Sequence, residues 1–146
     1  MVRVICVSGS VGCGKTKYSK RLAKEKDYNY IDLNKIIDEN KLKEKYDRKR
    51  KTWEVDVSKL KKVLIKMINN FSGKGIIIDG HLSHYLPRKY VDKVVIMKCE
   101  LKKLKKRLEK RNYSKNKIRE NLDAEIFDVC FEEAKSLKHK IEIVES

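Results

Sequence analysis

The sequence predicts an α/β fold in three layers, with a parallel β-sheet covered by helices on both faces. Short apolar runs alternate along the chain with stretches of helical periodicity, as in sheets built from right-handed crossovers. The later runs are short and rich in β-branched residues, which is typical of strands buried on both faces. The chain has 146 residues, of which 40% are hydrophobic, so its size suits one domain with one core. We expect this domain to span residues 1–146.

The individual elements follow from the same periodicities. The expected strands are residues 2–7, 30–33, 75–79, 94–98 and 141–144, and the first helix is expected over residues 17–26. Ser58 is the expected N-cap of an amphipathic helix, whose apolar face is formed by Leu60, Val63, Leu64, Met67, Ile68 and Phe71. A helix with otherwise basic faces is marked by Leu101, Leu104 and Leu108. A single longer helix is expected through Ile118, Leu122, Ile126, Val129, Ala134 and Leu137.

A phosphate-binding loop follows the first predicted strand. Residues 9–16 read G-S-V-G-C-G-K-T and match the pattern G-x-x-x-x-G-K-T. Glycines let the backbone close around an anion, so that successive N–H groups point at phosphate oxygens. We expect Lys15 to reach the β- and γ-phosphates, Thr16 to place its hydroxyl on Mg²⁺, and the next helix to offer its positive N-terminal end. The motif predicts binding of a nucleoside triphosphate, and a glycine-rich turn without a ligand is the alternative.

A carboxylate and a histidine are expected at the end of the third strand. In nucleotide-binding folds an aspartate at the place of Asp79, one strand away from the phosphate loop, holds Mg²⁺ directly or through water. The alternative is a turn aspartate that precedes Gly80. His81 follows closely, where it would orient a water near the γ-phosphate or hydrogen-bond a metal ligand. A histidine packed in a polar loop is the alternative for this residue.

Two charged segments, residues 34–57 and 110–120, interrupt the alternation of strands and helices. The first carries the only tryptophan, Trp53, and is too long for an ordinary connection. Segments of this kind lie at the carboxyl edge of open α/β sheets, where substrates bind. Trp53 and Tyr113 are candidates for stacking on bases, and packing in the core or the hinge is the alternative. Three arginines crowd the second segment, and we expect one of them to act on the nucleotide: Arg107, Arg111 and Arg119.

The composition is strongly basic, with 37 Lys and Arg against 21 Asp and Glu and a net charge of +16. Most of the excess falls in residues 41–62 and 98–119. An excess of this size favours RNA or another acidic surface as a partner. The alternative is a lysine-rich composition that reflects genome base bias or adaptation to heat.

The four cysteines, at positions 6, 13, 99 and 130, have neither disulfide-motif nor zinc-ligand spacing. We expect three of them to be small apolar side chains buried in the core. We also expect the protein to be in a reducing compartment. Cys13 is the exception, because we expect the phosphate loop to be exposed and rich in N–H donors; a thiol whose pKa these donors lower is one interpretation, and an ordinary thiol is the alternative. No run approaches the roughly 20 apolar residues of a membrane span. We therefore expect a soluble, cytoplasmic protein with no membrane partner.

Several stretches match one known family. Besides the phosphate loop, Asp79-Gly80-His81 matches its D-x-H, residues 107–114 match its short lid and residues 119–130 match the helix that follows. On these residues, and over essentially its whole length, the chain resembles the adenylate kinase isoenzyme 6 family of small P-loop proteins. Members are described both as broad-specificity nucleoside monophosphate kinases and as ATPases in maturation of the small ribosomal subunit.

The resemblance implies a P-loop kinase fold with five parallel strands in the order 2-3-1-4-5. It implies a monophosphate-binding insert near residues 34–57 and a lid near residues 110–120. It also implies ATP contacts at Gly12, Cys13, Gly14, Lys15, Thr16, Lys17 and Arg111. Mg²⁺ would be held by Thr16 and Asp79, and the catalytic set would be Lys15, Asp79, His81 and Arg111.

Two functions are compatible with this resemblance. The first is transfer of the γ-phosphate of Mg-ATP to AMP or a related nucleoside monophosphate. The second is an ATP-regulated ribosome-assembly factor that binds the ribosomal protein uS11 or ribosomal RNA. The chain departs from the family at Lys17, where many relatives have a hydroxyl, and at Asn112, where the lid usually has glycine. An arginine of the first insert in eukaryotic relatives aligns with Asp38, which favours the second function.

Overall fold

The computed structural model describes residues 2–49 and 52–146. Its centre is a sheet of five parallel strands in the spatial order β2-β5-β1-β6-β7. The strands are β1 (Arg3–Gly9), β2 (Asn29–Asp32), β5 (Gly75–Asp79), β6 (Lys93–Lys98) and β7 (Ile141–Glu145). Because β3 and β4 lie outside this sheet, the observed order is the predicted order 2-3-1-4-5, and the prediction is confirmed.

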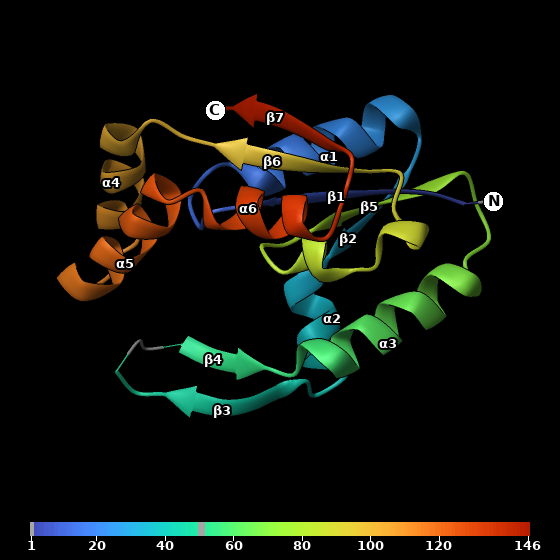
Figure 1. Cartoon of the computed structure of the whole chain (residues 1–146), viewed down its shortest axis with the longest axis horizontal. Coiled ribbons are helices and arrows are strands. Elements are labelled where there is room, and N and C mark those ends of the chain that lie inside the picture. Colours follow the sequence, from blue (N-terminus) through green and yellow to red (C-terminus); the bar gives the residue numbers. More distant parts are fainter. Residues whose placement is uncertain (1, 50–51) are drawn as a thin grey trace.

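Helices cover both faces of the sheet (Figure 1). They are α1 (Lys15–Lys26), α2 (Leu33–Glu39), α3 (Val57–Asn69), α4 (Leu101–Lys110), α5 (Lys115–Ile126) and α6 (Val129–Ser136). Successive side chains of a strand point to opposite faces, so β1 serves two clusters: Val4 and Cys6 pack with α3 and α6, whereas Ile5 and Val7 pack with α1 and α4. The near-continuous apolar strands of the sequence reflect this burial on both faces.

The first charged segment forms helix α2 and an antiparallel hairpin, β3 (Lys43–Asp47) and β4 (Thr52–Val55), that projects from the body of the protein (Figure 1). Helix α3 follows, and its N-cap is Asp56, whose side chain accepts a hydrogen bond from the Lys59 backbone N–H at 3.1 Å. The prediction of Ser58 as the cap is therefore wrong by two residues. A carboxylate is an equally good cap and starts the helix half a turn earlier.

The single long helix expected after residue 117 is also wrong, because the chain breaks between α5 and α6. Asp128 adopts a left-handed conformation with φ of 51° and leaves the two helices at different orientations. Aspartate tolerates this region better than most residues. The break allows α5 to contact the phosphate loop while α6 packs on the sheet.

The turn of the second charged segment lies between α4 and α5. Asn112 has a φ of 58°, and Ser114 caps α5 by accepting from the Lys117 backbone N–H at 3.2 Å. Asparagine thus adopts the positive φ for which glycine is the usual choice. None of the helices among the described residues is long and apolar enough to cross a membrane.

Candidate functional site

The loop of residues 9–16 connects the end of β1 to the start of α1 and forms a cradle. Gly9, Gly12 and Gly14 have φ values of 136°, 91° and 79°, which residues with a Cβ rarely adopt. At Gly9 a Cβ would also lie 2.5 Å from the carbonyl oxygen of Met97 on the neighbouring strand β6. Both the conformation and the close approach of β6 therefore require glycine there.

Lys15 folds back over this cradle. Its Nζ donates to the carbonyl oxygens of Gly9, at 3.0 Å, and Ser10, at 2.9 Å. Removal from water is the main cause that lowers the pKa of Lys15. The loop thus holds one ammonium group among backbone dipoles at the end of the sheet.

Three side chains meet beside the loop. The Thr16 hydroxyl donates to Asp79 Oδ2 at 2.8 Å, and the Tyr30 hydroxyl donates to the same oxygen at 2.7 Å. Asp79 is only 4% exposed, and its carboxylate reaches the loop because β5 lies next to β1. Tyr30 is not among the site residues predicted from the sequence. Its place two residues before the end of β2 is a signal only once β2 is known to lie beside β5.

A cavity of about 540 Å³ opens over this cluster. Most of the predicted site residues line it, namely Gly12, Gly14, Lys15, Thr16, Lys17, Asp79, His81 and Arg111. A second hollow of about 770 Å³ shares Val11, Asn34, His81 and Arg111 with the first and continues along α5 past Tyr113. The two hollows therefore meet at His81 and Arg111, at the carboxyl edge of the sheet.

Cys13 is the predicted residue that does not line the cavity. Its side chain is fully buried and donates to Glu125 Oε2, with 3.6 Å between Sγ and the oxygen. Burial, followed by the negative charge of Glu125, raises the pKa of Cys13. The expectation of an exposed thiol with a lowered pKa is wrong, because the side chain points into the protein.

Glu125 of α5 holds the phosphate loop in place through hydrogen bonds on its protein side. It is 8% exposed, and it accepts hydrogen bonds from the Ser10 hydroxyl at 3.2 Å and from the Cys99 backbone N–H at 2.8 Å, besides the Cys13 thiol. A buried carboxylate is stable only when donors of this kind satisfy it. Sequence reasoning missed Glu125, because one glutamate in a charged helix carries no signal of burial.

The three arginines of the second charged segment are in different environments. Arg111 lines the cavity over the loop. Arg107 turns inward, and its guanidinium donates to Gly12 O at 3.1 Å and to Ser146 Oγ at 3.0 Å. Arg119 is exposed and forms an ion pair with Asp123 at 3.2 Å. Only Arg111 of these three thus reaches the hollow where the predicted site residues gather.

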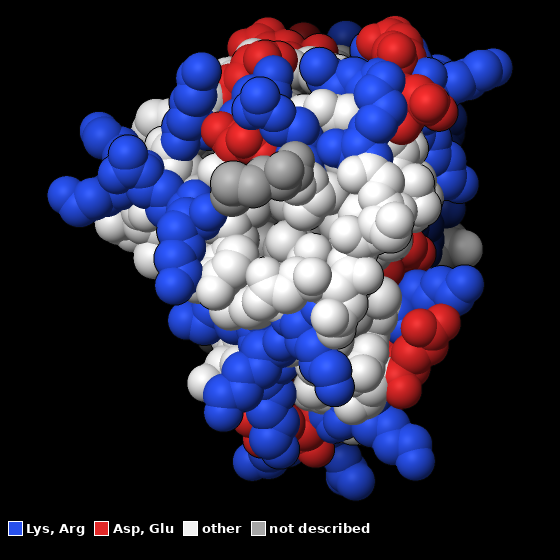
Figure 2. Space-filling view, turned by 90° about the vertical axis from the view of Figure 1, so that its right-hand side faces the viewer, with Lys and Arg blue, Asp and Glu red and all other residues white. Residues whose placement is uncertain are grey.

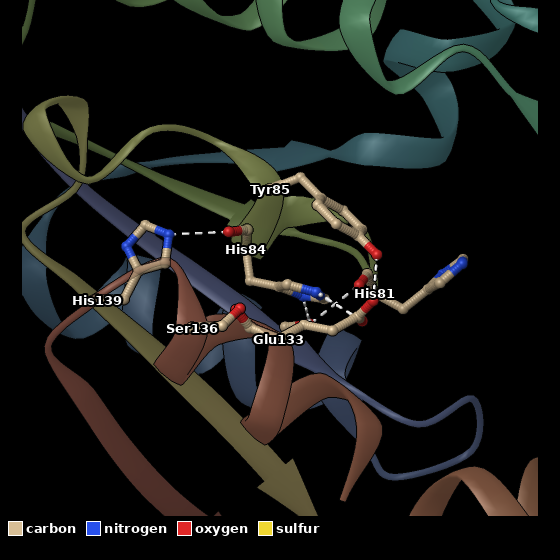
Figure 3. Close-up of polar contacts among 7 residues, drawn as sticks. His81, His84, Tyr85, Glu133, Ser136 and His139 are labelled. Atoms are coloured by element: carbon tan, nitrogen blue, oxygen red, sulfur yellow. Dashed lines mark hydrogen bonds and ion pairs between the residues drawn. The ribbon is translucent and has the colours of Figure 1, made fainter.

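His81 lies at the rim of the cavity, and its ring points away from a buried polar cluster (Figure 3). The residue is exposed at this rim, but its protein surroundings limit hydration of the ring, and this effect, followed by the nearby Lys15 ammonium, lowers the pKa of His81 to about 4. The imidazole is therefore neutral at pH 7, able to accept one hydrogen bond and to donate another.

The buried cluster centres on His84, which the sequence analysis did not assign. Its Nδ1 lies 2.7 Å from Ser8 Oγ, and its Nε2 lies 3.1 Å from Glu133 Oε1 of α6. The Tyr85 hydroxyl donates to the other oxygen of Glu133, as Figure 3 shows. Burial is the main cause that lowers the pKa of His84. These contacts tie the segment after β5 to α6 and to β1 just before the phosphate loop.

A larger groove, about 900 Å³, lies at the opposite edge of the sheet, near Arg3, Phe71 and Tyr90. Figure 2 shows that side of the molecule, where Lys and Arg border most of an uncharged area and Asp and Glu border the rest. None of the predicted site residues lines this groove. The chemistry-bearing residues of the sequence gather instead at the carboxyl edge.

Comparison with known proteins identifies the family of the chain. A family model described as an AAA domain matches residues 5–128. The "Putative adenylate kinase" of Methanosarcina acetivorans is 36% identical over 135 residues, which are 90% of this chain and 70% of that protein. The adenylate kinase isoenzyme 6 homolog of Caenorhabditis elegans is 34% identical over 131 residues, 90% of this chain and 71% of the relative.

Solved structures place the fold among P-loop kinases. Shikimate kinase from Acinetobacter baumannii superimposes with a TM-score of 0.66 at 12% identity, covering 100% of this chain and 86% of that one. That similarity supports the fold alone, whereas the family follows from the sequence matches along nine-tenths of the chain. The chain belongs to the adenylate kinase isoenzyme 6 family of P-loop proteins.

Proposed function

We propose that this protein is a nucleoside monophosphate kinase of the adenylate kinase type, which transfers the γ-phosphate of Mg-ATP to AMP or a related monophosphate. The observation that carries the proposal is the junction of two hollows at His81 and Arg111. One lies over the phosphate loop, and the other extends between Asn34 and α5. Two substrates that exchange a phosphoryl group need adjoining sites of this kind.

The residues of the first hollow suit a polyphosphate. Lys15 would exchange its carbonyl partners for the β- and γ-phosphates, and Arg111 would spread its planar guanidinium over the transferring group. The backbone at Gly12, Cys13 and Gly14 and the ammonium of Lys17 complete the ATP contacts that we propose. Charge neutralisation and in-line positioning would supply most of the acceleration.

Thr16 and Asp79 are the residues that would hold Mg²⁺. Their side chains offer only oxygen atoms, which this cation prefers, and they already lie together at the cavity. In such sites Mg²⁺ neutralises phosphate charge, and the protein supplies one or two ligands while the nucleotide supplies others. Neutral His81 would hold the attacking oxygen, either of the acceptor phosphate or of water.

Residues 34–57 and 110–120 are proposed as the monophosphate-binding insert and the lid of a single domain spanning residues 1–146. The insert begins with α2 beside the shared hollow, and the lid carries Arg111 at its start. Closure of both segments would exclude water from the transferring group. The cytoplasmic location expected from the sequence stays a prediction.

A coupled assay tests the kinase. We expect two ADP to form for each ATP consumed when AMP is present, and little ADP from ATP alone. Lys15→Ala should abolish turnover, because the loop loses its ammonium, whereas Lys24→Ala, on the exposed face of the same helix, should not change it. Equal ADP production with and without AMP would contradict the kinase role, and near-normal turnover by Lys15→Ala would show that the site lies elsewhere.

A second function is favoured by the charge. The net charge is +16, and most of the excess falls in residues 41–62, which include the hairpin, and in residues 98–119, which include α4. ATP binding and hydrolysis would then regulate docking to uS11 or ribosomal RNA during small-subunit maturation. Sedimentation with small-subunit precursors at rising salt tests this, and lack of co-migration at low salt would exclude it.

A further inference from the structure

We propose that Tyr30 is a positioning residue, which orients the Asp79 carboxylate for the cation of the nucleotide site. The inference rests on the proposed function, since it concerns the Mg²⁺ that accompanies ATP. It assigns a role to a residue outside the phosphate loop, the D-x-H motif and the lid. One oxygen atom, Asp79 Oδ2, accepts the hydrogen bonds that define this role.

Two hydroxyl groups converge on that oxygen. Thr16 donates to it from the start of α1 at 2.8 Å, and Tyr30 donates from β2 at 2.7 Å. Both donors use Oδ2, so the lone pairs of Oδ1 are left for a ligand in the cavity that Asp79 lines. The two donors approach from different elements and therefore fix the rotation of the carboxylate, which a single donor would not do.

Strand register explains why a tyrosine is needed. Tyr30 pairs with Ile77, two residues before Asp79 on the same face of β5. A side chain at this position must run along the sheet for two residues to reach the carboxylate. Only a long, rigid side chain with a terminal donor does so at low entropic cost, and the phenol of tyrosine has that shape.

The Tyr30 hydroxyl donates to a carboxylate that is only 4% exposed, so few other donors can replace it there. We expect the Thr16 oxygen to bind the cation as well as to donate to Asp79. Tyr30 donates to Asp79 and is not expected to bind the cation.

The test is Tyr30→Phe, which removes this donor and keeps the ring that packs in the core beneath α1. We expect the Mg²⁺ concentration for half-maximal ADP formation to rise about tenfold, as for loss of one charge-assisted hydrogen bond. The affinity of the protein–ADP complex for Mn²⁺, read by electron paramagnetic resonance, should weaken by a similar factor. The dissociation constant of ADP without metal should not change.

Tyr28→Phe is the matched control, because it removes the same atom two residues earlier, where the phenol ring packs against Gly75. It should leave both metal measurements unchanged. Equal metal dependence in Tyr30→Phe and the wild type would overturn the inference, as would equal weakening in both variants. A wild-type protein without nucleotide-dependent Mn²⁺ binding would instead overturn the proposed function.

Discussion

Replacement of Glu125 by alanine tests whether α5 holds the phosphate loop in place. The change removes the acceptor for the Cys99 N–H, which makes the short hydrogen bond of 2.8 Å, and for the Ser10 hydroxyl at 3.2 Å. The long contact of 3.6 Å from Cys13 adds little. The protein loses these bonds but also no longer buries a carboxylate, so the two effects oppose each other.

The magnitude follows from the donors left behind. A buried N–H without an acceptor costs about 1–3 kcal/mol, and one lost methylene costs about 0.8 kcal/mol. Relief from carboxylate burial offsets part of this, so we expect a loss of about 2–3 kcal/mol in the free energy of unfolding. For a chain of this length that is a decrease in Tm of roughly 5–10 °C. Glu125→Gln keeps one acceptor oxygen and should lose about 1 kcal/mol.

Urea unfolding followed by circular dichroism measures these differences. Glu109→Ala, at an exposed position of α4, is the control and should stay within about 0.5 kcal/mol of the wild type. Both Glu125 variants should also raise the KM for ATP more than they lower kcat, because the loop no longer presents its N–H groups in a fixed geometry. A Glu125→Ala protein as stable as the control would refute the role of α5 as an anchor.

Three other predictions follow from the site. Arg111→Ala should lower kcat at least tenfold, whereas Arg119→Ala should leave it within twofold, because only Arg111 of the two lines the cavity. Equal losses of kcat in steady-state assays of the two variants would contradict this placement. Stability should fall as the pH decreases below about 6.5. Burial lowers the pKa of His84, and limited hydration together with the Lys15 ammonium lowers that of His81 to about 4, so the unfolded chain binds more protons in this window. Urea midpoints that do not change between about pH 7.5 and pH 5 would speak against it. The Cys13 thiol should react with a maleimide far more slowly than a thiol in unfolded protein, because burial raises its pKa. Mass spectrometry after limited labelling measures this rate, and rapid modification would show that the loop exposes the Cys13 side chain.

Much of the fold and the motif set was accessible from the sequence because local patterns encode them. Apolar runs and helical spacing predict the strands of the main sheet, and the glycines of residues 9–16 predict a loop that closes around an anion. The misplaced cap of α3 and the undetected break at Asp128 are errors of one kind. Apolar periodicity shows which face of a helix is buried, but it does not show where the helix begins or turns.

The sequence by itself determined the parallel sheet, the phosphate-binding loop and the presence of Asp79 and His81 at a strand end, since each depends on residues close together in the chain. The tertiary structure decided which distant groups support them. Tyr30 hydrogen-bonds Asp79 across 49 positions of the sequence and Glu125 hydrogen-bonds Ser10 across 115, and nothing in their neighbours marks them. The hydrogen bond of Tyr30 depends on the order of the strands, and those of Glu125 depend on how α5 packs before the left-handed break at Asp128. Both are properties of the whole packed chain.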